Sequence, residues 1–423
     1  MQIKNIHLVN YRGMEDLALD FGPGINLIIG DNGAGKSSLL KGLSVALGHL
    51  FSCFWPEEAR TMEGQDIRMV SSRVGDVTES MEQFLPAAIG CTLDFCNEEY
   101  TYQQTRELNS SETSNFDAAN KMKELVNDKD ASLPLLSYQS AVRGFFNTTQ
   151  EVKQPGGPVE RRQGYADCLN VDCLNDQKVF DTVQNWCANM DYAEYKYRHE
   201  IEEYRLFKRI VSKFIKELEE SETAPQVDFS PKLSRLVFSE GEKGYLIHNL
   251  SAGYQSILCL IMELAYRTVL LNPRLKDPGA LEGVVLIDEI DIHLHPRWQW
   301  RILGALRATF PNVQFIIATH SPIVISSAEE AKLILMETPD IVKYLPDAYG
   351  YNIGDVVELT QGSMDMPQEL RKWRQEIEGA LDENDLQKAE KIVEAAEEKL
   401  GRDSVTSKRL REFFEVNKWI VEE

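Results

Sequence analysis

The start of the chain combines several patterns of hydrophobic and polar positions. Residues 3–9 and 17–21 alternate apolar and polar side chains, which is the period of half-buried strands. Residues 25–29 form a mostly apolar run, and residues 39–43 then place leucines at helical spacing. The pattern predicts two strands joined by a tight turn at 11–13, then a buried strand, a glycine-rich loop and a helix.

Further along the chain, apolar runs are typical of strands that are buried on both faces. Such runs cover residues 133–138, 284–287 and 313–317, whereas 257–271 and 298–309 have helical spacing. Buried strands that alternate with helices predict an α/β fold with a mixed sheet.

Two other regions are helical and more polar. Residues 180–220 carry apolar and aromatic side chains at helical spacing among charges, and the tail repeats this pattern. The tail helices are predicted at 367–381, 385–400 and 404–419, with Asp385 as an N-cap and Gly401 as a C-cap. The predicted domains are an N-terminal lobe at 1–154, a helical insert at 155–235, a C-terminal lobe at 236–345 and a helical domain for dimer or partner docking at 346–423.

The composition is that of an acidic globular protein. Lys and Arg number 45 against 67 Asp and Glu, a net charge of −22, which disfavours broad non-specific binding to nucleic acid. The 7 cysteines form no C-x-x-C pair, so we predict reduced thiols rather than disulfides or a zinc site. Residues 1–13 lack the basic head and apolar stretch of a signal peptide. We therefore expect a cytoplasmic protein that has no membrane partner.

The glycine-rich loop between the buried strand and the helix runs from Gly30 to Ser38. Glycine allows turns in which successive backbone N–H groups converge on a phosphate chain, and the start of the helix adds a favourable dipole. Lys36 is placed to reach the β- and γ-phosphates, and the Ser37 hydroxyl to bind Mg²⁺. The loop is a P-loop, so we expect ATP and Mg²⁺ as cofactors. The residues predicted to contact the nucleotide here are Asn32, Gly33, Ala34, Gly35, Lys36, Ser37 and Ser38.

Two carboxylates directly follow the buried strand at 284–287. Asp288 is predicted to support the Mg²⁺ ion, and Glu289 to polarise the attacking water as a general base. Lys36 completes this predicted catalytic set because it neutralises phosphate charge.

The opening I-K-N-I-H-L-V-N-Y-R-G, followed by the P-loop, resembles the ATPase heads of the Rad50, SMC, RecF and OLD group, which are relatives of ABC ATPases. The resemblance implies that Arg12 approaches the phosphates and that Gln139, which follows a strand, helps to ligate Mg²⁺. Residues 319–322, T-H-S-P, are similar to the H-switch of this group, in which His320 senses or stabilises the γ-phosphate. The implied fold class is α/β, an ABC-type P-loop ATPase head with a helical insert and a C-terminal helical appendage.

Residues 250–255, L-S-A-G-Y-Q, resemble the ABC signature loop. Ser251, Gly253 and Gln255 precede or begin a helix, and a helix start with such residues forms a second anion site. One protomer cannot use this site on its own P-loop phosphate, so we expect it to serve a second copy of the chain.

The segment 333–340 distinguishes branches of this group. Glu337 ends a strand as in the Toprim nuclease of OLD proteins, but Thr338 stands where that motif has glycine and no D-x-D follows a later strand. We therefore expect no nuclease site in this chain. The head, a short linker and acidic tail helices resemble instead the PtuA ATPases of Septu and retron anti-phage defence systems.

The resemblance to PtuA implies a regulatory ATPase of a defence complex. It also implies a separate HNH nuclease subunit that this ATPase controls. The split signature site, in turn, predicts that two copies of the chain assemble head to tail around ATP, which they hydrolyse. A retron reverse transcriptase with its msDNA or ncRNA is a further partner that the resemblance implies.

Two alternatives stay open from the sequence: an OLD-like ATPase with its own nuclease, and a RecF- or Rad50-like DNA repair ATPase. The net charge of −22 and an insert too short for a long coiled coil disfavour the repair protein. A strip of basic residues keeps it open, although such clusters are usually solvated helix faces. The strip comprises Arg161, Arg162, Lys196, Arg198, Arg205, Lys208 and Arg209.

Overall fold

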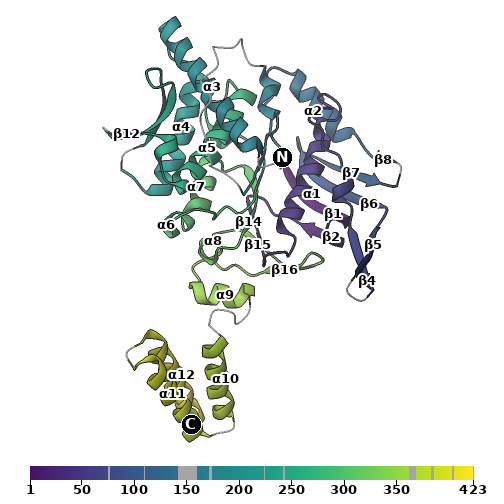
Figure 1. Cartoon of the computed structure of the whole chain (residues 1–423). Coiled ribbons are helices and arrows are strands. Elements are labelled where there is room, and N and C mark those ends of the chain that lie inside the picture. Colours follow the sequence, from purple (N-terminus) through teal and green to yellow (C-terminus); the bar gives the residue numbers. More distant parts are fainter. Residues whose placement is uncertain are drawn as a thin grey trace. The chain divides into compact units, whose positions relative to one another are not determined.

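The computed structural model divides into two compact units, Met1–Val356 and Val357–Glu423, each of which is described by itself (Figure 1). The boundary predicted between residues 154 and 155 lies outside the described residues. The residues that the structure describes are 1–74, 77–108, 110–141, 160–170, 174–222, 224–241, 243–361, 368–382, 385–402 and 404–422.

The larger unit contains a central sheet with the strand order β16-β15-β3-β14-β13-β9. All of these strands run parallel except β16. Every residue of β3, β9, β13 and β14 is buried, as expected for parallel strands that are covered on both faces. The bounds are Ile25–Ile29 (β3), Leu135–Gln139 (β9), Gly283–Ile287 (β13), Val313–Thr319 (β14), Lys332–Thr338 (β15) and Ile341–Leu345 (β16).

The register of this sheet brings strand ends together. Thr319 at the end of β14 pairs with Ile29 at the end of β3, and Ile287 at the end of β13 pairs with Gln139 at the end of β9. Parallel strands share one direction, so the segments that follow them leave from one edge. Ligands of open α/β sheets bind at this carboxyl edge.

A second, antiparallel sheet has the order β2-β1-β6-β7-β8. Helix α1 (Lys36–Gly48) contacts strands of both sheets, and its Leu39, Leu40 and Leu43 are fully buried. Each such leucine contributes roughly 1.5–3 kcal/mol relative to an exposed one. The strands are Gln2–Tyr11 (β1), Met14–Asp20 (β2), Ala87–Phe95 (β6), Glu98–Arg106 (β7) and Ser111–Thr113 (β8), with a separate hairpin of Met69–Val74 (β4) and Val77–Gln83 (β5).

Helices α3, α4 and α5 pack together beside the central sheet (Figure 1). The Trp186 ring of α3 lies 5.9 Å from Tyr204 and 5.3 Å from Phe207, both on α4, and 5.5 Å from Tyr266 on α5. The aromatic face of 180–220 is therefore part of the core of the larger unit. The elements of this region are Leu174–Tyr197 (α3), Glu202–Glu219 (α4), Ala252–Leu271 (α5), Ile302–Thr309 (α7) and the strands Gln226–Ser230 (β10), Arg235–Glu240 (β11) and Lys243–Leu246 (β12).

The smaller unit is helical, as predicted for the tail. Its core includes Ile377, Val393 and Phe414. Asp385 caps α11, since its Oδ1 accepts a hydrogen bond from the Lys388 N–H at 3.0 Å. The helices are Gln368–Asp382 (α10), Leu386–Leu400 (α11) and Val405–Glu422 (α12). The remaining α-helices among the described residues are Asp117–Asn127 (α2), Pro296–Gln299 (α6), Pro322–Ser326 (α8) and Ile353–Gln361 (α9).

Candidate nucleotide-binding site

The P-loop connects β3 to α1, and its backbone requires glycine. Gly30 has φ +153° and Gly35 has φ +99°, and a Cβ at Gly30 would lie only 2.3 Å from the Met336 carbonyl oxygen. Helix α1 begins at Lys36 and has no side-chain cap on its first turn. Its first N–H groups therefore have no capping side chain as acceptor, and a helix start of this kind attracts phosphate.

Lys36 lies under this loop and is only 5% exposed. Its Nζ donates to the carbonyl oxygens of Gly30 and Asp31, at 2.9 Å each. Burial lowers the pKa of the ammonium group, and nearby carboxylates oppose that shift. These carboxylates belong to Asp288, Glu289, Asp31 and Asp291.

Asp288 and Glu289 follow β13 at the carboxyl edge of the sheet. The Asp288 N–H donates to the Gln139 carbonyl oxygen at 2.9 Å, which joins the ends of β13 and β9. Glu289 has φ +46°, in the left-handed region of backbone conformation. This region is unfavourable for a residue other than glycine, so the surrounding structure must hold Glu289 in it. In the same loop, the Asp291 carboxylate accepts a hydrogen bond from the Thr319 hydroxyl at 2.5 Å, so β14 is tied to this loop as well.

His320 follows β14, the strand that lies between β3 and β13. Burial lowers the pKa of its imidazole, and the positive charge of Lys36 lowers it further. Asp291, Glu289 and Asp31 act in the opposite direction but do not outweigh these causes. His320 is therefore mainly neutral at neutral pH, since the ordinary pKa is 6.5.

Gln139, at the end of β9, is held by a chain of buried polar groups. Its amide nitrogen donates to the Ser137 hydroxyl at 2.8 Å, and that hydroxyl donates to Glu263 of α5 at 3.4 Å. Arg267 then donates from Nε to the same Glu263 oxygen at 2.8 Å. The orientation of the Gln139 amide therefore depends on α5.

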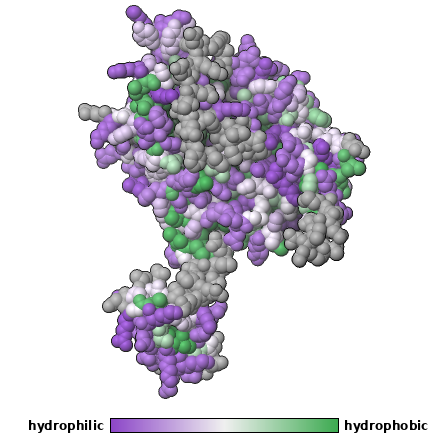
Figure 2. Space-filling model, viewed as in Figure 1, coloured by the Kyte–Doolittle hydropathy of each residue, from purple (hydrophilic) through white to green (hydrophobic). Residues whose placement is uncertain are grey.

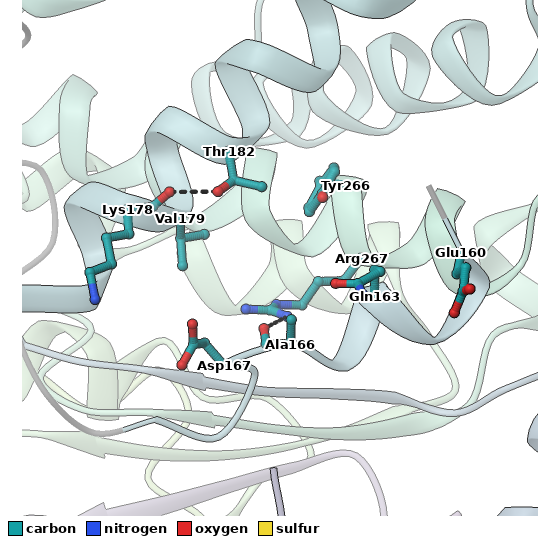
Figure 3. Close-up of a pocket in the computed structure, with 9 residues that line it drawn as sticks. All are labelled: Glu160, Gln163, Ala166, Asp167, Lys178, Val179, Thr182, Tyr266 and Arg267. Atoms are coloured by element: carbon teal, nitrogen blue, oxygen red, sulfur yellow. Dashed lines mark hydrogen bonds between the residues drawn. The ribbon is translucent and has the colours of Figure 1, made fainter. Parts of the chain in front are cut away.

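Arg267 also borders a cavity of about 550 Å³ (Figure 3). Its Nη1 donates to the carbonyl oxygens of Gly164 and Ala166, at 2.9 Å each. No predicted nucleotide contact lines this cavity, so it is separate from the P-loop. Its lining residues are Glu160, Gln163, Ala166, Asp167, Lys178, Val179, Thr182, Tyr266 and Arg267.

The signature residues form the start of α5. Ser251 is the N-cap, and its Oγ accepts a hydrogen bond from the Tyr254 N–H at 3.5 Å. A Cβ on Gly253 would lie 2.7 Å from the His293 carbonyl oxygen, so glycine permits close approach to the loop after Glu289. The Tyr254 ring packs edge-on against Trp298, at 4.5 Å between centroids.

Gln255, in the first turn of α5, stabilises the loop that precedes this helix. Its amide nitrogen donates to the carbonyl oxygens of His248 and Leu250, at 3.1 and 2.8 Å. Within the described part of the chain, the side-chain hydrogen bonds of Ser251 and Gln255 stay in their own loop and helix, and none of them reaches the P-loop.

Arg12 lies in the turn between β1 and β2. This turn is next to the P-loop, because a Cβ on Gly35 would lie 3.2 Å from the Cε of Met14, the first residue of β2. The Arg12 Nε and Nη2 donate to Asp66 Oδ1 at 2.9 and 2.6 Å, and its backbone N–H donates to the Asp66 carbonyl oxygen at 2.7 Å. The guanidinium is thus bound to a carboxylate that is itself only 5% exposed.

The predicted site residues fall into two groups. Lys36, Asp288, Glu289 and His320 act on one another electrostatically at one sheet edge, and Gln139 joins them through β9. The signature residues and the Arg12 guanidinium have other partners. Sequence reasoning did not assign roles to Asp31, Asp291, Asp66, Glu263 or Arg267. The Glu263–Arg267 pair had a detectable signal, since two opposite charges stand four residues apart in an apolar helix.

A P-loop, two carboxylates and a histidine at the carboxyl edge of a parallel sheet define a nucleotide-binding ATPase. In agreement, a family model described as an AAA domain matches residues 5–228, and a second AAA-domain model matches 189–326. The first match covers more than half of the chain, so the chain belongs to this AAA-domain family.

Within this class, the chain is similar to Septu and retron ATPases, as predicted. It is 26% identical over 415 residues to the Septu protein PtuA of Bacillus thuringiensis, covering 93% of this chain and 92% of that protein. It is 25% identical over 414 residues to the retron Vc95 probable ATPase of Vibrio cholerae serotype O1 biovar El Tor, covering 86% and 79%. Among solved structures, the SMC head domain from Thermotoga maritima matches with a TM-score of 0.46 and 14% identity, covering 82% of this chain and 99% of that one.

Among the described residues, α5 is long and apolar enough to cross a membrane by length and composition. However, 83% of its apolar window is buried inside the larger unit, which is the usual state of a core helix. This helix is therefore only weak evidence for a membrane span.

Proposed function

We propose that this chain binds ATP with Mg²⁺ at the P-loop and hydrolyses it. The residues present fit that ligand, because the loop offers a cradle that a Cβ at Gly30 would fill, a helix start without a side-chain cap and an almost buried ammonium group. Lys36 and the N–H groups of residues 32–38 would hold the phosphates. Ser37, Asp288 and Gln139 would hold Mg²⁺, which when bound neutralises phosphate charge.

One observation carries this proposal: Lys36, Asp288, Glu289 and His320 converge at a single sheet edge although they come from separate segments. Glu289 stands one residue beyond Asp288, which suits it to accept a proton from the attacking water. Arg12 would have to exchange its Asp66 partner for phosphate, so its role depends on that ion pair opening.

His320 is expected to couple ATP binding to proton uptake. Its pKa is lowered in the free chain, and a γ-phosphate beside it adds negative charge that raises the pKa. As the pH falls toward about 6.5, ATP should therefore bind more tightly and take up a proton. Isothermal titration calorimetry in two buffers of different ionisation enthalpy measures this uptake. His320→Gln should remove it, whereas the exposed His7→Gln should not; equal uptake in all three proteins contradicts the assignment.

The signature residues support a second proposal, that the active unit contains two copies of the chain. Ser251 and Gly253 lie at an anion-binding helix start whose hydrogen bonds do not include the P-loop of the same chain. We propose a head-to-tail dimer in which ATP bound to Lys36 and Ser37 of one copy also contacts Ser251 and Gly253 of the other. Such an interface is closed by two-fold symmetry and forms two identical sites.

Ser251→Arg is expected to leave ATP binding to the single chain intact and to weaken the ATP-dependent dimer about 100-fold, because the longer side chain occupies the space of the γ-phosphate. Analytical ultracentrifugation with and without ATP measures this. Ser110→Arg is a matched control, since it adds the same group at an exposed site. Equal dimerisation of the two variants would contradict the split site.

A mixture of two variants tests whether the site is shared between two copies of the chain. Ser251→Arg keeps its P-loop, and Lys36→Ala keeps its signature residues, so a mixed dimer contains one complete site. We expect the mixture to recover ATP hydrolysis that neither variant has alone. No recovery, together with intact folding of both chains, would indicate that the site lies within one copy.

For the biological role, we propose a regulatory subunit of an anti-phage defence complex in the cytoplasm, in which ATP state controls a separate HNH nuclease. Support comes from the similarity to Septu PtuA over 93% of this chain and to a retron ATPase over 86%. The unit Val357–Glu423 has its own helical core and is the part proposed to dock a partner or a second copy. A reverse transcriptase with its msDNA or ncRNA would join if the complex is of the retron type.

The experiment for this role combines the purified chain with an HNH protein encoded beside it. We expect the two to copurify and the nuclease activity of the complex to depend on ATP. Cleavage of plasmid DNA by the chain alone with Mg²⁺ or Mn²⁺ would instead support an OLD-like nuclease. In that case Glu337→Gln should abolish the cleavage, because Glu337 is the residue at the position of the Toprim acid.

A further inference from the structure

Most of the basic strip predicted from the sequence is engaged within the chain. Arg161 donates to the carbonyl oxygens of Leu271 and Ala131, and Arg209 donates to that of Lys276. Three others have carboxylate partners: these ion pairs are Arg162–Glu160, Arg205–Glu202 and Lys208–Asp228, at 2.8, 2.6 and 3.0 Å. Within the residues that the structure describes, Lys196 and Arg198 have no such carboxylate. The strip is therefore not a continuous basic surface, and only its end stays free.

This end also carries exposed aromatic rings. Tyr192, Tyr195 and Tyr197 at the end of α3 are 50%, 83% and 62% exposed, although tyrosine usually buries much of its ring. Tyr192, Tyr195 and Lys196 are spaced three and four residues apart, so they share one helix face. We call residues 192–199, with these rings and cations, the α3 tip.

The aromatic rings and cations of the tip lie next to one another. The Lys196 ammonium lies 5.2 Å from the centre of the Tyr197 ring, and that ring is 6.1 Å from the His199 ring. No ring partner of Tyr195 is found within the described part of the chain, and its side chain is largely in solvent. A planar, negatively charged ligand would therefore meet both a free ring face and positive charge.

The acidic residues near the tip interact with groups that lie outside the tip. Glu194 is partly buried and accepts a hydrogen bond from the Ile201 N–H at 2.8 Å. Asp191 is also partly buried and lies within the field of Lys208 of α4. Beyond the tip, Glu200 pairs with Arg205 at 3.7 Å. These contacts leave Tyr192, Tyr195, Lys196 and Arg198 as the outward groups.

We propose that the α3 tip binds single-stranded nucleic acid. Bases stack on Tyr192 and Tyr195, and the phosphates between them contact Lys196 and Arg198. Aromatic stacking tolerates any base, and a few cations suffice for a short strand. The chain as a whole carries a net charge of −22, which repels a longer duplex, so contact is confined to the tip. This proposal goes beyond ATP hydrolysis and does not depend on it.

A single strand suits this surface better than a protein partner does. Protein interfaces are usually anchored by contiguous apolar and aromatic side chains in a packed core. At the tip, Tyr195 and Tyr197 instead alternate with Lys196 and Arg198, since residues 195–199 read Y-K-Y-R-H, and Tyr192 adds a third ring one helical turn earlier. That alternation of rings and cations is the arrangement found on stacking platforms for unpaired bases.

Fluorescence anisotropy of the full chain with labelled oligonucleotides of about 20 residues tests the proposal, with oligothymidine as DNA, oligouridine as RNA and a duplex as a third arm. We expect at least one of the two single strands to bind at low salt. Comparison of the affinities for oligothymidine and oligouridine then shows whether the tip prefers DNA or RNA. Tyr195→Ala should weaken binding about tenfold, whereas Tyr195→Phe should keep it. Lys196→Ala should reduce the salt slope by about 0.7.

Tyr245→Ala is the matched control, because Tyr245 is 47% exposed on β12 and carries no role here. Circular dichroism melting of each variant confirms that it is folded. The proposal is overturned if neither strand binds, if duplex binds as well as single strands, or if Tyr195→Ala and Tyr245→Ala behave alike. Loss of a copurifying protein from Tyr195→Ala, with strand binding unchanged, would assign the tip to a protein partner instead.

Discussion

Lys36→Ala is expected to weaken ATP binding about 100-fold, or about 2.7 kcal/mol, and to abolish hydrolysis. The reason is twofold. The phosphates lose a charge-assisted donor that is almost fully buried, and the carboxylates of Asp288, Glu289, Asp31 and Asp291 then face the triphosphate without the positive charge of the lysine to offset them. Titration with a fluorescent ATP analogue measures affinity, and phosphate release measures turnover.

Lys41→Ala is the control for this variant. Lys41 lies on the same helix and is only partly buried, so the change removes the same side chain and charge outside the loop. We expect its affinity for ATP to stay within about twofold of the original chain, as is usual for surface substitutions. If Lys36→Ala binds ATP as well as Lys41→Ala does, the P-loop is not the nucleotide site.

Glu289→Gln is expected to lower the rate of ATP hydrolysis about 10²- to 10⁴-fold, which corresponds to roughly 2.7–5.5 kcal/mol in the barrier. Glutamine has nearly the same shape but cannot accept the proton of the attacking water. ATP binding should be kept, because Lys36 and the loop amides are untouched. The chain should therefore accumulate as an ATP-bound dimer, which light scattering after size exclusion measures.

Glu337→Gln provides the comparison for Glu289→Gln. Glu337 is an exposed carboxylate that pairs with Lys343 at 2.5 Å, so its neutralisation should leave hydrolysis unchanged. Normal turnover in Glu289→Gln would exclude this residue as the base. A loss of ATP binding in the same variant would show that it supports the nucleotide or Mg²⁺ rather than the water.

Much of the fold was predictable because its signals are local. The strand at 25–29, the glycine loop and the helix after it are present as β3, the P-loop and α1. In the tail, Asp385 caps α11 and Gly401 has φ +85°, as their residue types predicted. Caps, turns and periodic burial depend on neighbours within a few residues, so the sequence displays them directly.

Contacts between distant segments were not predictable in the same way. Arg12 and Asp66 are 54 residues apart, and no pattern in either segment indicates that they pair. Gln139 depends on Glu263 of α5 through Ser137, which is 126 residues from that carboxylate. The basic strip was visible as a cluster of charges, but the structure pairs most of them with acids or carbonyl groups.

By itself, the sequence determined that this chain has a glycine-rich P-loop, a strand that ends in two carboxylates and a helical tail, because each is specified by residue type and spacing. Only the tertiary structure decided which of these groups meet: parallel strands in register place Lys36, Asp288, Glu289 and His320 at one edge. It also decided that Arg12 binds Asp66, and that the α3 tip keeps free rings and cations. Ion pairing and burial depend on which surfaces pack together, and that is settled only when the whole chain has folded.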